Sequence, residues 1–214
     1  MGLLYKTYVD DDCILGCWKI EETTEELKEQ LYLSEQEIHR LNAFKTCKRK
    51  KEWLSVRALL KELCNANARI CYLNDKPFLE DRSHEISISH SNELTCMIIG
   101  KTKKVGIDIE YISDKIERIQ HRFINEKENV NIQGQKEQKI LLYLHWSAKE
   151  AIYKIHGKKK ISFKEHIFVN PFELSQEGQF NAHLINGEDN IAFRLTYKIL
   201  DNYVVVWSSK EIKE

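Results

Sequence analysis

The sequence predicts an α+β protein built as a pseudo-dimer of two similar α/β lobes, residues 1–103 and 104–214. The first half of the chain shows strand patterns, then helical patterns, then strands, and the second half repeats the order of helices followed by strands. A chain of 214 residues is long enough for two small domains with cores of their own. Only two prolines and eight glycines occur, and no Ser/Gly-rich linker separates the halves, so we expect a compact chain.

In the first half, apolar alternation predicts strands over residues 3–9, 14–20, 69–73, 85–91 and 95–99. Helical spacing predicts one helix over residues 24–33 and another through Trp53. Between them, Ser34 followed by Glu37 fits a capping box, in which the two side chains satisfy each other's backbone N–H groups at a helix start. The sequence Asn-Asp-Lys-Pro at residues 74–77 predicts a turn.

In the second half, residues 114–124 have a helical pattern, and residues 136–156 form the strongest helical pattern of the chain. Strands are expected over residues 105–111, 167–169, 180–185, 191–197 and 203–208. The last two are separated by the turn residues Asp201 and Asn202, which predicts a hairpin.

Composition excludes several classes of function. Lys+Arg and Asp+Glu balance at 33 each, so no overall charge would attract the chain to nucleic acid or to a membrane surface. No apolar run approaches the ~20 residues that span a bilayer. The first residues lack the basic start, apolar stretch and small-residue cleavage site of a secretory signal, so we expect a cytoplasmic protein.

Six cysteines are scattered along the chain, without a CxxC pair or a histidine at zinc spacing. They are Cys13, Cys17, Cys47, Cys64, Cys71 and Cys96. Most have apolar neighbours, so we expect small buried hydrophobes in a reducing compartment rather than disulfides or metal ligands.

The strand over residues 105–111 carries the first candidate functional residues. Its apolar residues alternate with Gly106, Asp108 and Glu110, so one face of the strand is apolar and the other bears two carboxylates roughly 6.5–7 Å apart. Such a face can simply be solvated. Alternatively, two like charges this close are stabilised by a cation between them.

The long helix carries a second group. Trp146, Lys149, Glu150, Tyr153 and Lys154 follow one another at i, i+3, i+4, i+7 and i+8, which places them on one stripe. The simpler interpretation is an exposed ion pair between Glu150 and Lys154. The aromatic residues favour a partly buried stripe, in which charges need a bound partner.

Asp108, Glu110 and Glu150 together form an all-oxygen ligand set of the kind that suits Mg²⁺ bridged to substrate phosphates. Basic residues near the same elements would then hold the phosphates, although a basic run is more often a solvated helix face. These are Lys149, Lys154, Lys76 and the cluster at residues 48–51, with His90 as a further hydrogen-bond donor.

Three blocks of sequence resemble the 4′-phosphopantetheinyl transferase superfamily in their order and approximate spacing. They are Ile-Ser-Ile-Ser-His-Ser at residues 86–91, Val-Gly-Ile-Asp-Ile-Glu at 105–110 and Trp-Ser-Ala-Lys-Glu-Ala at 146–151. The resemblance spans roughly residues 48–160 and is closest to the two-lobed type that activates peptide synthases such as surfactin synthetase. It implies an active site at the interface of the two lobes.

The resemblance also implies an activity. Such enzymes transfer the 4′-phosphopantetheine group of coenzyme A to a serine of an apo acyl or peptidyl carrier protein, require Mg²⁺ and release adenosine 3′,5′-bisphosphate. Asp108, Glu110 and Glu150 match the metal ligands. The matching coenzyme A contacts are Arg49, Arg57, Lys76, Pro77, Ser89, His90, Lys149 and Lys154. Asp75 departs from the pattern, because the family has a glycine at this place in the turn.

For catalysis we expect Glu150 to remove the serine proton, with Glu128 as the second candidate, and Lys154 to offset charge on the leaving group. Residues 112–135, between the metal strand and the long helix, are the expected carrier-docking segment, and one chain with two lobes would suffice as a monomer. Two other interpretations remain: a Mg²⁺-dependent nucleotide phosphohydrolase, and a non-catalytic coenzyme A-binding module. The sequence does not identify the carrier protein or the tolerance for acylated coenzyme A.

Overall fold

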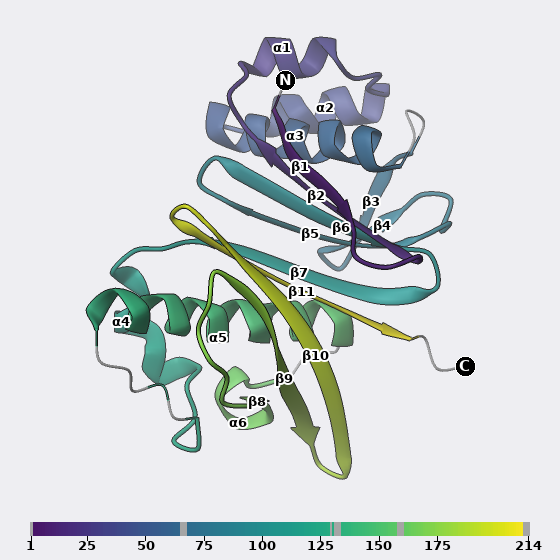
Figure 1. Cartoon of the computed structure of the whole chain (residues 1–214). Helices are drawn as coiled ribbons and strands as arrows, with labels where there is room; N and C mark the ends of the chain where they lie inside the picture. The colour runs from purple at the N-terminus through teal and green to yellow at the C-terminus, as the bar shows by residue number, and fades with distance from the viewer. Residues whose placement is uncertain (1, 65–67, 129, 131–133, 158–160, 212–214) are drawn as a thin grey trace. The chain divides into compact units, whose positions relative to one another are not determined.

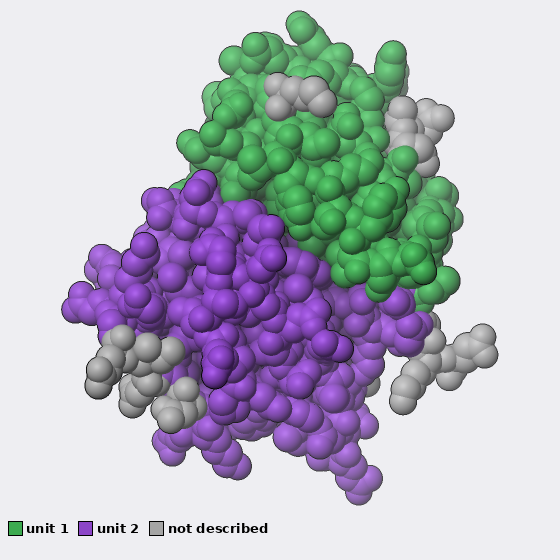
Figure 2. Space-filling model, in the orientation of Figure 1, with its two compact units in different colours: residues 1–102 green, residues 103–214 purple. Residues whose placement is uncertain are grey.

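A computed structural model describes residues 2–64, 68–128, 130, 134–157 and 161–211. The chain divides into two compact units, residues 1–102 and 103–214, which Figure 2 shows in green and purple. The division falls one residue before the predicted lobe boundary. Within the described ranges, no helix is both long enough and apolar enough to cross a membrane.

The first unit contains a four-stranded antiparallel sheet with the strand order β1-β2-β6-β5. Its strands are β1 (Leu3–Tyr8), β2 (Cys13–Lys19), β5 (Glu85–Ser91) and β6 (Leu94–Gly100). A separate two-stranded ribbon is formed by β3 (Ile70–Leu73) and β4 (Lys76–Leu79).

Three helices belong to this unit: α1 (Thr24–Glu29), α2 (Glu35–Ala43) and α3 (Cys47–Leu63). The predicted capping box is confirmed, because the Ser34 side chain accepts from Glu37 N, and Glu37 Oε2 accepts from Ser34 N at 3.1 Å. The long helix α3 packs on β2 and β6 (Figure 1). Gly16 permits this packing, since a Cβ there would lie only 2.8 Å from Leu63 Cδ2.

The second unit contains a five-stranded antiparallel sheet with the order β7-β11-β10-β9-β8. Its strands are β7 (Lys103–Tyr111), β8 (Ile167–Val169), β9 (Glu177–Asn186), β10 (Asp189–Leu200) and β11 (Tyr203–Glu211). The predicted hairpin is confirmed, because Leu200 pairs with Tyr203 across the Asp201-Asn202 turn.

Helix α5 (Gln135–His156) lies across one face of this sheet and packs on β7 and β11 (Figure 1). It ends at Gly157, whose φ of 68° is the left-handed conformation that commonly terminates helices. Shorter elements flank it: α4 (Lys115–Ile119), a 3₁₀ turn η1 (Gln120–Arg122) and α6 (Phe163–His166). The α+β class is therefore confirmed.

The structure differs from the sequence-based prediction in local details. Lys76 and Pro77 begin strand β4 rather than lying in the turn, which consists of Asn74 and Asp75 with φ values of 50° and 65°. Asp75 thus adopts the left-handed conformation that a glycine would adopt there, and Asp tolerates it better than most residues. The helix predicted over residues 114–124 breaks into α4 and η1.

The prediction of uniformly reduced cysteines is wrong in this structure. Cys17 on β2 and Cys96 on β6 are bonded as a disulfide, with a Cα–Cα distance of 4.2 Å. The two residues are direct partners in the β2–β6 ladder, although they are 79 positions apart in the sequence. A pairing between strands that are distant along the chain cannot be read from cysteine spacing.

Candidate functional site

The close approach of β7 to α5 determines the geometry of the acidic residues. Gly106 faces α5 at the point of contact, since a Cβ on it would collide with the Ala151 carbonyl oxygen and lie 2.8 Å from Ile155 Cγ1. Asp108 and Glu110 follow at two-residue spacing and therefore share this face of the strand. The glycine allows both carboxylates to lie beside the helix that carries Glu150.

Two side chains of α5 bind the β7 carboxylates. Lys154 Nζ donates to Asp108 Oδ1 at 2.9 Å and to the Ile107 carbonyl oxygen at 2.8 Å. Trp146 Nε1 donates to Glu110 Oε1 at 3.1 Å. Asp108 is only 4% exposed, so its charge is stabilised mainly by these neighbours rather than by bulk water.

The pKa of Glu150 is affected by both carboxylates of β7. Burial raises the pKa of Glu150 to about 7, and the negative charge of Asp108 is the next cause of the increase. Lys154 lowers this pKa in part, while Glu110 raises it. The region therefore contains more negative charge than its one lysine neutralises.

These residues suit a hard cation by their chemistry. Clustered carboxylate oxygens are the ligands that Mg²⁺ prefers, and the raised pKa of Glu150 indicates that a further positive charge would be stabilised here. In the part of the chain that the structure describes, no three His, Cys, Asp or Glu side chains already stand close enough to hold a metal ion. Lys154 already brings one positive charge to Asp108.

Lys149, predicted to contact coenzyme A, and Glu128, predicted as a second candidate base, are both buried and form an ion pair with each other. Lys149 has no exposed surface, and its Nζ donates to Glu128 Oε2 at 2.6 Å. The ammonium also contacts the carbonyl oxygens of Phe123 and Phe163, at 2.5 and 3.1 Å. With its three donors used inside the protein, Lys149 does not present a charge to coenzyme A phosphates, and Glu128 is a buried partner rather than an accessible base.

In the first unit, Arg49 and His90, two of the predicted coenzyme A contacts, lie beside each other. Arg49 Nη1 lies 3.0 Å from His90 Nε2 and 3.1 Å from Glu52 Oε2. Arg49 is near the start of α3 and half exposed, and His90 is at the end of β5. Ser89, its neighbour on β5, is half-buried. Sequence reasoning missed Glu52, although its position three residues after Arg49 on a helix was the available signal.

Arg57, another predicted coenzyme A contact, is largely buried in the first unit. It is 7% exposed, and its Nε donates to Glu37 Oε1 at 2.9 Å. Its guanidinium also lies over the Trp53 ring, 3.1 Å from the centroid. The contact with Glu37 joins α3 to α2, and the contact with Trp53 lies within α3. The side chain also lines two pockets of the first unit, so its contact with coenzyme A stays a prediction.

Lys76 and Pro77 line a pocket of about 170 Å³ at the start of β4. Arg82 and His84 lie on the same pocket. Lys76 is exposed, and Pro77 and His84 are half-buried, so a small anionic ligand could reach the basic groups.

Comparison with known proteins finds a family match in the second unit, where the three carboxylates lie. Residues 104–209, which contain β7 and α5, match the family described as the 4′-phosphopantetheinyl transferase superfamily. A curated relative, the 4′-phosphopantetheinyl transferase HetI of Nostoc sp. (strain PCC 7120), is 27% identical over 142 residues. That alignment covers 58% of this chain and 60% of the relative. Through this match, which the relative supports, residues 104–209 of the chain belong to the 4′-phosphopantetheinyl transferase superfamily.

Proposed function

We propose that the protein transfers the 4′-phosphopantetheine group of coenzyme A to a serine of an apo acyl or peptidyl carrier protein, with Mg²⁺, and releases adenosine 3′,5′-bisphosphate. The observation that supports this most is the placement of Asp108 and Glu110 on β7 beside Lys154 and the helix that carries Glu150, within the residues that match the family.

Asp108, Glu110 and Glu150 would hold the magnesium ion. When bound, Mg²⁺ neutralises charge on the diphosphate of coenzyme A. Lys154 is 26% exposed in its side chain, so it can turn from Asp108 toward a phosphate and offset charge on the leaving bisphosphate. The serine oxygen forms a bond to the phosphorus of the pantetheine phosphate, and the bond from that phosphorus to the bridging oxygen breaks.

Glu150 is our proposed general base for the serine proton. Its raised pKa of about 7 belongs to the protein without a bound cation; Mg²⁺ would lower this pKa, so Glu150 would be ionised and could accept the proton, directly or through a metal-bound water. Glu128, the second candidate, has both oxygens committed to buried donors and is not proposed further.

In the first unit, we propose that Arg49 and His90 contact the 3′-phosphate of coenzyme A, while Lys76, Pro77 and Ser89 contact its nucleotide. The basic side chains around the pocket at Lys76 support this assignment. That both lobes contribute to one active site, and that the protein acts as a monomer, stay predictions. Of the predicted docking segment at 112–135, residues 129 and 131–133 lie outside the described residues.

A transfer assay with mass spectrometry tests the proposal and separates it from the phosphohydrolase alternative. Purified protein is incubated with coenzyme A and Mg²⁺, with and without an apo-carrier protein. We expect a mass gain of one phosphopantetheine on the carrier and bisphosphate release only when the carrier is present. Release without carrier would favour hydrolysis, and coenzyme A binding without any release would favour a non-catalytic module.

A further inference from the structure

The buried ion pair between Lys149 and Glu128 connects three segments of the second unit. Lys149 lies on α5, one residue before Glu150. Glu128 accepts from the Asn125 backbone N–H through Oε2 and from the Val169 backbone N–H through Oε1, both at 2.8 Å. The pair therefore joins the middle of α5 to the turn after η1 and to the end of β8.

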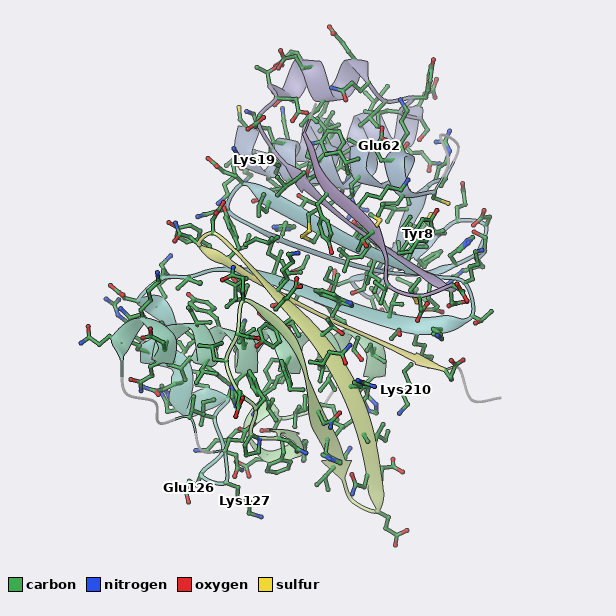
Figure 3. All side chains as sticks on the ribbon, in the orientation of Figure 1. Tyr8, Lys19, Glu62, Glu126, Lys127 and Lys210 are labelled. Carbon is green, nitrogen blue, oxygen red and sulfur yellow. A yellow bond between two sulfur atoms is a disulfide. The ribbon has the colours of Figure 1, made fainter. Side chains whose placement is uncertain are left out.

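Exposure distinguishes Glu128 from its neighbours in the same turn. Glu126 and Lys127 point away from the unit into solvent, as Figure 3 shows, while Glu128 turns inward and is 6% exposed. Burying two charges is costly, and well-packed apolar residues of similar volume often stabilise a fold as well or better. The pair offers directed hydrogen bonds that apolar residues lack, since Lys149 holds two specific carbonyl oxygens and Glu128 two specific N–H groups.

The two carbonyl groups held by Lys149 belong to residues whose rings pack against Trp146. The ring centroid of Phe123 is 5.2 Å from that of Trp146, in an edge-to-face arrangement, and that of Phe163 is 5.5 Å away. These contacts restrict the indole on two sides. Its Nε1 then donates to Glu110 at 3.1 Å. A continuous set of contacts thus runs from Lys149 to Glu110.

We infer that the Lys149–Glu128 pair and Trp146 are positioning residues that orient the Glu110 carboxylate as a metal ligand. The pair holds Phe123 and Phe163, these rings hold Trp146, and the indole N–H fixes one oxygen of Glu110. This inference rests on the proposed function, because it takes Glu110 as a ligand. Removal of a group that holds a metal ligand in place typically weakens metal affinity by about 10–100-fold.

The test measures metal binding rather than turnover, with Mn²⁺ as a spectroscopic substitute for Mg²⁺. Mn²⁺ affinity is determined by electron paramagnetic resonance in the presence of coenzyme A, and coenzyme A affinity by calorimetry without metal. For Trp146→Phe, which keeps an aromatic ring but loses the N–H, we expect Mn²⁺ affinity about tenfold weaker. Affinity for coenzyme A should remain within about twofold of the wild type, since Trp146 would act only on the metal ligand.

Disruption of the ion pair is tested with two further variants. Glu128→Gln removes charge and an acceptor, so we expect weaker Mn²⁺ binding, a lower Tm and faster amide hydrogen exchange at Asn125 and Val169. The double variant Lys149→Met/Glu128→Met leaves no unpaired buried charge, so its Tm should exceed that of Glu128→Gln. It should stay below that of the wild type, since four backbone groups lose their partners, and Mn²⁺ binding should stay weak. Leu195→Ala on β10 is the matched control, since a core cavity lowers the Tm but leaves the contacts to Glu110 in place.

Unchanged Mn²⁺ affinity in Trp146→Phe would overturn the inference. So would a double variant that recovers both the Tm and the Mn²⁺ affinity of the wild type. A third contrary result is an equal loss of Mn²⁺ affinity and coenzyme A affinity in Glu128→Gln. Equal losses in Glu128→Gln would indicate that Lys149 contacts coenzyme A directly. Failure of the proposed function gives a different result. The wild type would then bind Mn²⁺, and Trp146→Phe would bind it more weakly, but the wild type would transfer no phosphopantetheine to any carrier.

Discussion

Lys154 extends from α5 to β7 and donates a hydrogen bond of 2.9 Å to Oδ1 of Asp108. The same ammonium lowers the pKa of Glu150, which burial and Asp108 raise to about 7. One lysine therefore partly neutralises a group of acids that the fold brings together.

Glu150 should make the stability of the protein depend on pH. Its folded pKa of about 7 lies above the unfolded value of 4.5, so its contribution to stability is fully present below pH 4.5 and is lost as the pH rises through 7. Glu150→Gln should therefore be more stable than the wild type at pH 8, on the order of 3 kcal/mol, and nearly equal to it at pH 4.5. Urea unfolding in EDTA at both pH values measures this difference.

The comparison with Glu150→Gln is needed because another buried group titrates nearby. Burial lowers the pKa of His145, and that shift makes stability rise with pH. Both proteins contain His145, so the difference between them isolates Glu150. A difference in unfolding free energy that does not change between pH 4.5 and 8 would contradict the raised pKa.

Gly106→Ala should separate β7 from α5. The new methyl group would meet the Ala151 carbonyl oxygen, which belongs to helix backbone and cannot turn away. We expect a loss of unfolding free energy of about 3 kcal/mol and reduced transfer activity. Gly187→Ala is the control, because a Cβ there meets nothing within 4 Å and only the φ of 64° is unfavourable. That control should cost about 1 kcal/mol and retain activity, and equal effects of both changes would disprove the role of Gly106.

His90→Ala should weaken coenzyme A binding through the 3′-phosphate. The histidine lies 3.0 Å from Arg49, so the two side chains can hold one phosphate together. Calorimetry with coenzyme A and dephospho-coenzyme A measures the effect. The wild type should prefer coenzyme A, and the variant should lose most of that preference. Equal affinities of the wild type for both ligands would refute the assignment.

The Cys17–Cys96 bond predicts a specific labelling pattern. Alkylation of the denatured protein without reductant should modify four of its six cysteines, and alkylation after reduction should modify all six. Intact-mass spectrometry counts the labels. Six labels without reduction would show that the two thiols are free in the isolated protein.

Residue periodicity was sufficient to identify the acidic face of β7 and the half-buried side of α5. Trp146, Glu150, Tyr153 and Lys154 all lie on that side, as their spacing predicts. Lys149 was assigned to the same stripe, but adjacent helix positions differ by about 100°, and this residue falls on the buried side. A charged residue on a core-facing position was the signal that it had an internal partner.

The partners themselves could not be predicted, because they come from segments distant in the sequence. Glu128 reaches Lys149 from a turn 21 residues earlier, and Arg57 pairs with Glu37 on another helix. Both pairings depend on how elements pack, which residue spacing does not encode. The pairing of β2 with β6, which brings Cys17 to Cys96, likewise joins segments that are distant in the sequence.

Magnesium-dependent transfer by Asp108→Ala tests whether this carboxylate holds the metal ion during phosphopantetheine transfer. The variant and a control, Asp189→Ala on the exposed start of β10, are compared with the wild type for phosphopantetheine gained by an apo-carrier with Mg²⁺. Circular dichroism and the Tm establish that each variant is folded. We predict that Asp108→Ala loses transfer by at least about a thousandfold, of the size found when a group that stabilises transition-state charge is removed, while Asp189→Ala keeps wild-type activity. A folded Asp108→Ala protein with near wild-type transfer would show that Asp108 is not a magnesium ligand needed for the reaction.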